Sequence, residues 1–336
     1  MDIETVEIKN LEKNDFIVDV RSEKEFEEDH IPGAINMPIL DNLQRHIVGY
    51  TYKQVSKDEA YKKGYDILEE KINDYVKKLK DVKKRIVIYC FRGGMRSRAV
   101  VEYLNKKGVS CFQLKDGYKV YRENVLIRLN EFDYSKKKVF ILHGLTGTAK
   151  TKIINKLDEG INLEGFAKHR SSLFGAVGLE PSAQKWFDTQ LIESLEKSGK
   201  NIIFEGESLK IGDVFIHKKL FDEMDKAIAI KIEMSLNQRV QNILDDYFDT
   251  EEKIEEVKEI IPKLAQKMGK KWVENLLEVF SKKDYKEVIK ILLTEYYDPL
   301  YTHFHKHHSP SYDTIIITDD IDEAIDKIKD FIRNKK

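Results

Sequence analysis

The segment IVIYCFRGGMRSRAVVEYL, residues 86–104, decides how the first half of this 336-residue chain folds. Its β-branched start predicts a strand that ends at Cys90, and the apolar spacing from Ser97 onwards predicts a helix. The stretch from Cys90 to Arg96 therefore forms a loop between a strand and a helix. Backbone N–H groups and a helix N-terminus in such a loop bind anions and favour a thiolate. We therefore predict that Cys90 is an acidic, nucleophilic catalytic thiol.

The rest of this loop suits an oxyanion. Its paired glycines let the backbone curl without a Cβ clash, and its paired arginines add fixed positive charge in bidentate geometry. The alternative, a buried cysteine that ends a core strand, needs neither pair. Cys111 lies in VSCFQL without such neighbours and is predicted to be a core residue. The predicted anion-binding residues are Arg92, Gly93, Gly94, Met95, Arg96 and Ser97.

Outward from this loop, strands and helices alternate, which is typical of a parallel sheet with helices on its faces. The polar stretch DYSKKK at residues 133–138 separates the two halves, so the predicted domains are 1–132 and 137–336. In the first domain we expect strands at 16–20, 34–37, 86–90 and 111–114 and helices at 23–28, 60–80, 97–107 and 117–129.

A second anion-binding pattern opens the other half, in KVFILHGLTGTAKTKIINKL at residues 138–157. A strand, a glycine-bearing turn and a helix follow one another, as a phosphate-binding loop requires, although an ordinary strand-turn-helix junction is the alternative. Lys150 would neutralise a bound diphosphate, and the Thr151 hydroxyl can ligate Mg²⁺ or a phosphate oxygen. Ala149 stands where the pattern Gly-x4-Gly-Lys-Ser/Thr has its second glycine, which weakens close backbone approach. The predicted diphosphate-binding residues are Gly144, Leu145, Thr146, Gly147, Thr148, Ala149, Lys150 and Thr151.

Two further segments of the second domain carry candidate site residues. LEGFAKHRSSLFGAVG, residues 163–178, mixes ionisable side chains with serines and glycines, and NIIFEGESLKIG, residues 201–212, runs from a strand into two carboxylates. Carboxylates at such a strand end lie beside the phosphate loop and can orient a cation or a nucleophile; a structural ion pair is the alternative. The residues predicted for this second site are His169, Arg170, Ser171, Glu205, Glu207 and Ser208.

The remainder of the second half predicts an α/β domain with a helical insertion. Helix-period apolar residues with few breakers extend over 251–303, so we place the insertion at about 235–305. Further strands are expected at 139–142, 202–205, 227–232 and 314–318, and further helices at 235–248 and 321–333.

Composition limits the compartment and the partners. Fifty-eight Lys plus Arg against fifty-nine Asp plus Glu give a net charge of −1, so an RNA partner would need a local basic patch. The chain has two cysteines, which excludes a disulfide framework and a four-cysteine zinc site. No apolar run reaches the roughly 18 residues of a membrane span, and no signal-peptide core is present. We therefore expect a cytoplasmic protein without a membrane partner.

FIVDVRSEKEFEEDHIPGAINMP, residues 16–38, together with the CFRGGMRS loop resembles the rhodanese family. The resemblance implies that Cys90 carries sulfur or selenium as a persulfide or perselenide. Asp19 and Arg21 are expected to hold this domain together through an ion pair. Cys-x5-Arg-Ser is also the spacing of cysteine-dependent phosphatases, and this alternative stays open, although Tyr89 replaces the histidine common before the loop in protein phosphatases.

The motifs CFRGGMRS, GLTGTAKT, LEGFAKHRSSLFG and FEGESLKIG, in this order, resemble the tRNA 2-selenouridine synthase family over nearly the whole chain. That resemblance implies an α/β fold in which a rhodanese-like parallel-sheet domain precedes a P-loop NTPase-like domain. It implies that 2-thiouridine at the wobble position of a tRNA is converted to 2-selenouridine. Geranyl diphosphate would first alkylate the sulfur, and selenium from selenophosphate would then displace the S-geranyl group. Both are co-substrates, no cofactor is tightly bound, and the synthetase that makes selenophosphate is a further candidate partner.

The implied substrates need further contacts. Basic runs at 77–85, 263–271 and 282–290 are candidate tRNA contacts, and the last two lie in the insertion, although charged helices are usually solvated faces. His303, His305, His307 and His308 are interpreted as a polar helix end or an RNA contact, so no metal site is predicted. Candidates for an apolar groove that holds the ten-carbon chain, with core packing as the alternative, are Trp186, Phe187, Phe166 and Phe174.

Two other classes of function stay open at this point. One is a small-molecule enzyme in which a sulfurtransferase or phosphatase domain is fused to an ATP-dependent kinase. The other is a regulatory module that binds a nucleotide and an anion without turnover.

Overall fold

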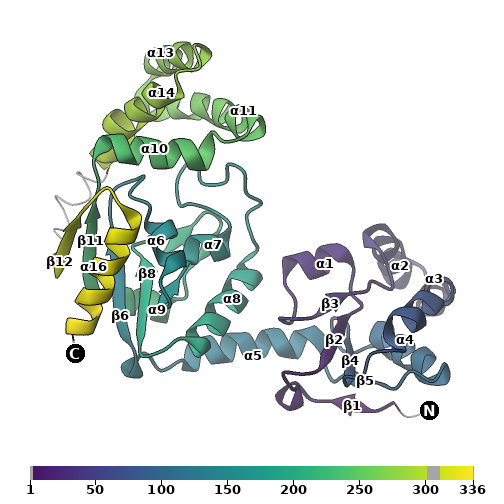
Figure 1. The fold of residues 1–336 in the computed structure, drawn as a ribbon. Coiled ribbons are helices and arrows are strands. Elements are labelled where there is room, and N and C mark those ends of the chain that lie inside the picture. Colours follow the sequence, from purple (N-terminus) through teal and green to yellow (C-terminus); the bar gives the residue numbers. More distant parts are fainter. Residues whose placement is uncertain (1–2, 301–310, 336) are drawn as a thin grey trace. The chain divides into compact units, whose positions relative to one another are not determined.

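The computed structural model describes residues 3–300 and 311–335 (Figure 1). The chain divides into two compact units, Met1–Asn130 and Glu131–Lys336. Within the described ranges, no helix has the length and apolar character that crossing a membrane requires. His303, His305, His307 and His308, for which a polar helix end or an RNA contact is predicted, lie outside the described residues, as does the end of the predicted insertion.

A five-stranded sheet forms the centre of the first unit, and all of its strand pairs are parallel. The spatial order of the strands is β1-β5-β4-β2-β3. β4, which leads to Cys90, lies between β5 and β2 and is buried along its whole length. The strands are β1 (Thr5–Val6), β2 (Phe16–Asp19), β3 (Ile35–Asn36), β4 (Ile86–Tyr89) and β5 (Cys111–Leu114).

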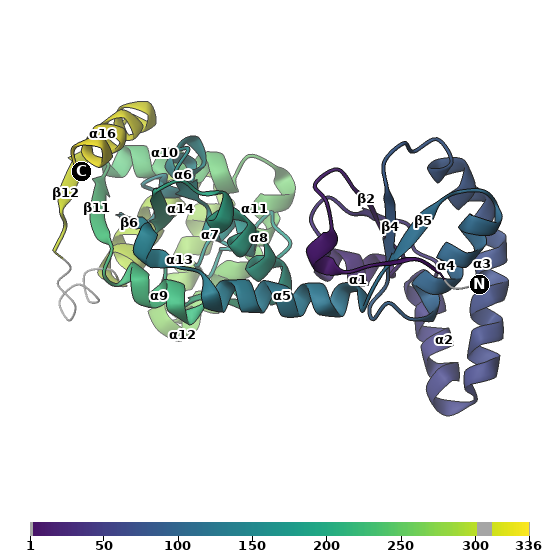
Figure 2. The same ribbon diagram turned by 90° about the horizontal axis from the view of Figure 1, so that it is seen from below.

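Two helices of this unit bury their apolar faces against the sheet. Leu68 and Leu79 of α3 and Val100 and Leu104 of α4 join Ile88 of β4 in one hydrophobic core. α2 and α3 run side by side as a helical hairpin (Figure 2). The helices are α1 (Glu23–Glu28), α2 (Asn42–Gln54), α3 (Lys57–Leu79), α4 (Met95–Lys106) and α5 (Gly117–Glu131).

The second unit contains another parallel five-stranded sheet, with the order β12-β11-β6-β8-β7. β6 is central, and the loops after β6, β8 and β11 leave the same edge of the sheet because the strands are parallel. A short antiparallel hairpin of β9 (Lys210–Ile211) and β10 (Val214–Phe215) follows β8. The sheet strands are β6 (Lys138–His143), β7 (Gly160–Ile161), β8 (Asn201–Glu205), β11 (Ile228–Glu233) and β12 (Thr314–Ile317).

Helices cover this sheet and build an additional helical layer at one end of it (Figure 1). The layer has its own core, in which Val257, Ile261, Leu276 and Val288 are buried together. The helices that accompany the sheet are α6 (Lys150–Lys156), α7 (Leu163–Ala167), α8 (Gln184–Lys197), α9 (Lys218–Met224) and α16 (Ile321–Asn334). The additional layer consists of α10 (Leu236–Tyr247), α11 (Glu251–Ile260), η3 (Ile261–Leu264), α12 (Ala265–Met268), α13 (Lys270–Ser281), α14 (Tyr285–Ile291) and the π-helical turn η4 (Leu292–Tyr297).

The predicted fold class is confirmed: both units are α/β domains built on a parallel sheet. The structure adds elements for which no range was predicted, among them α2, α7, α8 and α9 and the two-residue strands β1, β7, β9 and β10. Two-residue strands carry no periodic signal that a sequence pattern can reveal.

Candidate functional site

Cys90 directly follows β4 and is only 3% exposed. The Ser97 hydroxyl lies 3.2 Å from the Cys90 sulfur, to which it donates a hydrogen bond. Gln113 Nε2 of β5 donates to the Ser97 oxygen over 2.8 Å and to the Gly93 carbonyl over 2.7 Å. Because the Ser97 oxygen accepts from Gln113, its proton is directed towards the sulfur and the nearby Gly94 carbonyl. Gln113 was not among the residues predicted from sequence.

The two glycines of this loop differ in role. Gly93 has φ +58°, and a Cβ there would come within 2.8 Å of the Asp116 nitrogen and 2.9 Å of the Leu114 oxygen. Gly94 has φ −94°, and a Cβ there would meet nothing within 4 Å. The prediction that a Cβ would clash is therefore correct for Gly93 and wrong for Gly94. The absent side chain of Gly94 leaves open space at the start of α4, which follows directly.

The two arginines of the loop also differ. Arg96 donates to both carboxylate oxygens of Glu25, at 2.7 and 3.2 Å, so its guanidinium is occupied by α1. Burial by itself would raise the pKa of Glu25, but the hydrogen bonds and charge of Arg96 outweigh it and lower the pKa to about 2. Arg92 is exposed and lies 5.8 Å from the centre of the Phe91 ring. Of these two arginines, Arg92 is therefore the one whose guanidinium is accessible to an anion.

Beneath the loop, the expected ion pair of Asp19 and Arg21 is confirmed. The pair is fully buried with an N–O distance of 2.7 Å, and the Arg21 guanidinium lies 3.9 Å from the centre of the Tyr118 ring. Arg21 also donates to the Asp29 carbonyl over 2.6 Å. The predicted core position of Cys111 is confirmed as well, and burial raises the pKa of its thiol to about 12.

The phosphate loop of the second unit connects β6 to α6. Gly147 has φ +85°, and a Cβ there would approach the Arg239 oxygen to 2.8 Å. The buried Thr148 hydroxyl donates to the Leu145 carbonyl over 2.8 Å and closes the turn. Ala149 adopts φ 56° and ψ 27°, the left-handed conformation that the missing glycine would take without strain. The loop therefore keeps its shape with alanine, at a cost of roughly 1 kcal/mol.

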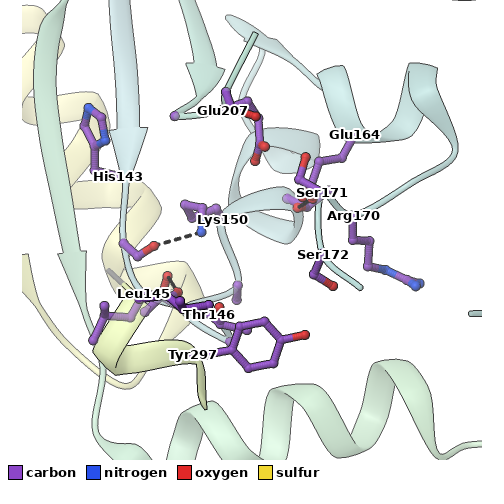
Figure 3. A pocket seen from close by; sticks show the side chains of 18 of the residues that line it. His143, Leu145, Thr146, Lys150, Glu164, Arg170, Ser171, Ser172, Glu207 and Tyr297 are labelled. Carbon is purple, nitrogen blue, oxygen red and sulfur yellow. Dashed lines mark hydrogen bonds between the residues drawn. The ribbon is translucent and has the colours of Figure 1, made fainter. Parts of the chain in front are cut away.

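Lys150 and Thr151 at the start of α6 are held by different partners. Lys150 Nζ donates to the Gly144 carbonyl over 2.9 Å, so the ammonium lies across the mouth of the loop (Figure 3). The Thr151 hydroxyl donates to Glu164 over 2.6 Å. Among residues 3–300 and 311–335, no group of three or more His, Cys, Asp or Glu side chains is arranged to hold a metal ion. Because the Thr151 hydroxyl donates its proton to Glu164, its oxygen keeps lone pairs that can ligate a magnesium ion without breaking this contact.

Two side chains of α10, in the insertion, donate hydrogen bonds to the phosphate loop. Arg239 is buried and donates to the Thr146 carbonyl over 2.8 Å, while its other nitrogens contact both oxygens of Asp298 at 3.0 and 2.6 Å. Asn242 donates to the Gly147 carbonyl over 2.8 Å. Neither Arg239 nor Asn242 was predicted, because polar residues on a helix of this composition are usually solvated.

A pocket of about 1240 Å³ opens above the loop, and all eight predicted diphosphate-binding residues line it. Of the predicted second-site residues, Arg170, Ser171, Glu207 and Ser208 also line the pocket, whereas His169 and Glu205 do not. His169 Nδ1 accepts a hydrogen bond from the Ser171 backbone N–H over 3.1 Å and so stabilises the segment that carries Ser171. Burial lowers the pKa of this imidazole.

The two carboxylates after β8 have different surroundings. Glu205 is completely buried and accepts the Leu163 N–H over 3.2 Å; burial and the Glu164 charge raise its pKa to about 8. Glu205 does not line the pocket, so a direct contact of its side chain with a bound group stays a prediction. Glu207 faces the pocket beside Lys150 and Ser171 (Figure 3). Burial and the Glu164 charge raise its pKa to about 7, against the opposing effects of Ser171 and Lys150.

A smaller, almost entirely apolar pocket of about 40 Å³ adjoins the first. Thr146, Ser172, Ile243, Tyr247 and Tyr297 line both pockets, so the apolar pocket lies directly against the large one. Among the four aromatic residues predicted for a hydrocarbon groove, Phe174 lines this pocket, whereas Phe166, Trp186 and the buried Phe187 do not. The other lining residues are Phe248, Val257, Ile289, Leu292 and Leu293.

The basic runs of the insertion are partly neutralised. Lys282 contacts Glu278 at 2.7 Å and Lys290 contacts Glu287 at 3.5 Å, as expected for solvated helix faces. Lys263 and Lys267, in contrast, lie at the large pocket. Of the two basic runs in the insertion, the run at 263–271 therefore places side chains at the pocket of the phosphate loop.

Comparisons with known proteins agree with this architecture. Residues 137–335 match the family model described as the tRNA 2-selenouridine synthase AAA domain, and residues 6–124 match that of the rhodanese-like domain. A tRNA 2-selenouridine synthase of Sulfurovum sp. (strain NBC37-1) is 30% identical over 85% of this chain and 87% of its own length. The tRNA 2-selenouridine synthase of Chromohalobacter salexigens is 33% identical over 70% of this chain and 65% of its own length. That of Hydrogenovibrio crunogenus is 28% identical over 89% of this chain and 91% of its own length. The resemblance carried by the four motifs is thereby confirmed, and the chain belongs to the tRNA 2-selenouridine synthase family.

Proposed function

We propose that this enzyme converts 2-thiouridine at the wobble position of a tRNA to 2-selenouridine in two steps, the first in the second unit and the second in the first unit. The observation that carries the proposal is that an apolar pocket lies against the pocket of the phosphate loop and shares five lining residues with it. A ligand that fills both has an anionic head and a hydrocarbon tail, as geranyl diphosphate does. A nucleotide would place a polar ribose and base where this apolar lining lies.

In the first step, the diphosphate lies on the backbone amides of residues 144–149. Lys150 leaves the Gly144 carbonyl, 2.9 Å away in this structure, and stabilises the charge that develops as pyrophosphate departs. The chain enters the apolar pocket past Thr146. Forty cubic ångströms are less than a ten-carbon chain needs, so the pocket widens on binding. The thiocarbonyl sulfur attacks the carbon that bears the diphosphate.

In the second step, the Cys90 thiolate attacks the phosphorus of selenophosphate and releases selenide, which displaces the S-geranyl group from C2 of the base as a thiol. Water then frees phosphate from the Cys90 sulfur, and no oxidation or reduction takes place. Alkylation in the first step is useful because a thiocarbonyl sulfur is a poor leaving group. The amides of the loop and the exposed Arg92 would hold the selenophosphate oxygens. The hydrogen bond from Ser97 supports a reactive sulfur. Arg96 is a positioning residue, because Glu25 occupies its guanidinium.

The same ion pair weighs against the alternative of a Cys-x5-Arg phosphatase. Such an enzyme places its loop arginine on the phosphate, whereas Arg96 donates to both oxygens of Glu25. We therefore retain a transfer reaction as the role of Cys90.

Purified variants separate the two steps. With an anticodon stem-loop that contains 2-thiouridine, Lys150→Ala is expected to lose geranylation, and Cys90→Ser is expected to accumulate the S-geranyl nucleoside without selenation. Cys111→Ser, a conservative change at a core thiol, is the control. Mass spectrometry of the nucleosides provides the measurement. Equal defects of both variants at both steps would contradict the assignment.

A further inference from the structure

Alkylation of a 2-thiouridine releases a proton that has to go to a group in the pocket. A C–S bond forms, and the C–O bond to the diphosphate breaks with its electron pair on the departing pyrophosphate. The base stays neutral only if N3 loses its proton as the C2–S double bond becomes single and a C2–N3 double bond forms. No oxidation or reduction takes place. The inference that follows rests on the proposed function, because it concerns the same alkylation step.

The four acidic side chains that line the pocket differ in whether their carboxylates can accept this proton. Glu164 accepts the Thr151 hydroxyl over 2.6 Å, and Asp246 accepts from Lys152 over 2.9 Å. Asp225 lies exposed at the end of α9. Glu207 belongs to the segment after β8 and faces the pocket beside Lys150 (Figure 3), with the side chains of Ser171 and Glu164 next to its carboxyl group. Its carboxylate is therefore near the leaving diphosphate and open towards the substrate.

We propose that Glu207 is the catalytic residue that accepts the N3 proton of 2-thiouridine while the sulfur is alkylated. A base acts best when it is within hydrogen-bond reach of the proton and when its pKa is near the working pH. Lys150 would hold the diphosphate next to Glu207, so the reacting base has to approach this carboxylate.

The electrostatic surroundings support the role. The charged groups that act on Glu207 are Glu164 of α7, Lys150 of α6 and Glu205 at the end of β8. Burial and Glu164 raise the pKa of Glu207 to about 7. When the diphosphate takes over the Lys150 charge, Glu207 loses a stabilising neighbour of its ionised form, and its affinity for a proton rises.

The test compares Glu207→Gln with the wild type in single-turnover geranylation of a 2-thiouridine stem-loop, from acidic to alkaline pH. The wild-type rate should rise with pH through 7 and level off above it, since the carboxylate must be ionised and the bound diphosphate raises its pKa further. Glu207→Gln should lose about 100-fold at neutral pH and recover at alkaline pH, where N3 ionises without help. Asp213→Asn, at an exposed carboxylate of the β9–β10 turn, should behave as wild type.

Two further measurements separate catalysis from structure. Glu207→Gln should bind geranyl diphosphate with undiminished affinity. A stem-loop methylated at N3 has no proton to lose, so the wild type should lose its pH dependence near 7 with this substrate, and the two proteins should react at equal rates. Wild-type rates of Glu207→Gln at neutral pH, or an equal loss at all pH values with both substrates, would overturn the role of Glu207. Absence of any S-geranyl product from the wild type would instead overturn the proposed function.

Discussion

The ion pair between Glu25 and Arg96 provides a quantitative test of how the cysteine loop is held. Glu25→Gln removes the charge and keeps the shape of the side chain. The pKa of Glu25 is lowered from 4.5 to about 2, because Arg96 outweighs the burial that would raise it. At about 1.4 kcal/mol per pKa unit, this difference corresponds to about 3 kcal/mol of folding free energy at neutral pH. We expect Glu25→Gln to destabilise the first unit by that amount.

The effect should depend on pH in a defined direction. The folded pKa lies below the unfolded one, so the stabilisation is complete above about pH 5 and is lost as the pH falls towards 2. The difference between wild type and variant should therefore decrease to roughly 1 kcal/mol near pH 3. Urea unfolding followed by far-UV circular dichroism measures it. Both tryptophans, Trp186 and Trp272, belong to the second unit, so tryptophan fluorescence serves as an internal reference.

A matched variant is Glu102→Gln, which removes the partner of the half-exposed Arg98 and should change stability by less than about 0.5 kcal/mol. The reasoning would be refuted if Glu25→Gln were as stable as wild type at neutral pH. A loss that stayed constant down to pH 3 would refute the electrostatic cause, since a lost packing contact does not titrate.

The other expectations concern the phosphate loop and the buried pair. Ala149→Gly should leave diphosphate affinity unchanged and raise stability by at most about 1 kcal/mol, as measured by calorimetry, because it removes left-handed strain but adds backbone entropy to the unfolded chain. Arg239→Met should weaken diphosphate binding about tenfold in titration calorimetry, since the Thr146 carbonyl and Asp298 lose their shared partner. Asp19→Asn should destabilise the first unit by about 3–5 kcal/mol in urea unfolding, because it leaves Arg21 buried without its counter-charge.

Most of the fold could be predicted from apolar runs and the residues that flank them. The strand at 111–114 and the helix at 23–28 have the predicted bounds, because each is a short apolar or capped segment with clear flanks. α2 was missed because its apolar residues Leu43 and Ile47 are exposed and leave no buried stripe to detect. The capping box of Asp41 and Gln44 was the available signal.

The residues of the candidate site that lie within one continuous motif could be predicted, and those that contact the motif from elsewhere in the chain could not. The loops around Cys90 and Lys150 are continuous in sequence, so a motif could indicate them. The residues that hold these loops act across long separations: Gln113 reaches Gly93 from a neighbouring strand, and Arg239 reaches the phosphate loop from the insertion. Sequence spacing contains no information about such contacts. Likewise, only the structure separates Glu205, buried beneath the pocket, from Glu207, which faces it.

The assignment of one reaction step to each unit is tested most directly with the intermediate itself. An RNA stem-loop that already carries S-geranyl-2-thiouridine is supplied with selenophosphate to Lys150→Ala and to Cys90→Ser, and 2-selenouridine is measured by mass spectrometry. Lys150→Ala should convert this RNA at the wild-type rate, because the geranylation step has been bypassed, and Cys90→Ser should leave it unchanged. Failure of Lys150→Ala, or conversion by Cys90→Ser, would contradict the division of the reaction between the two units.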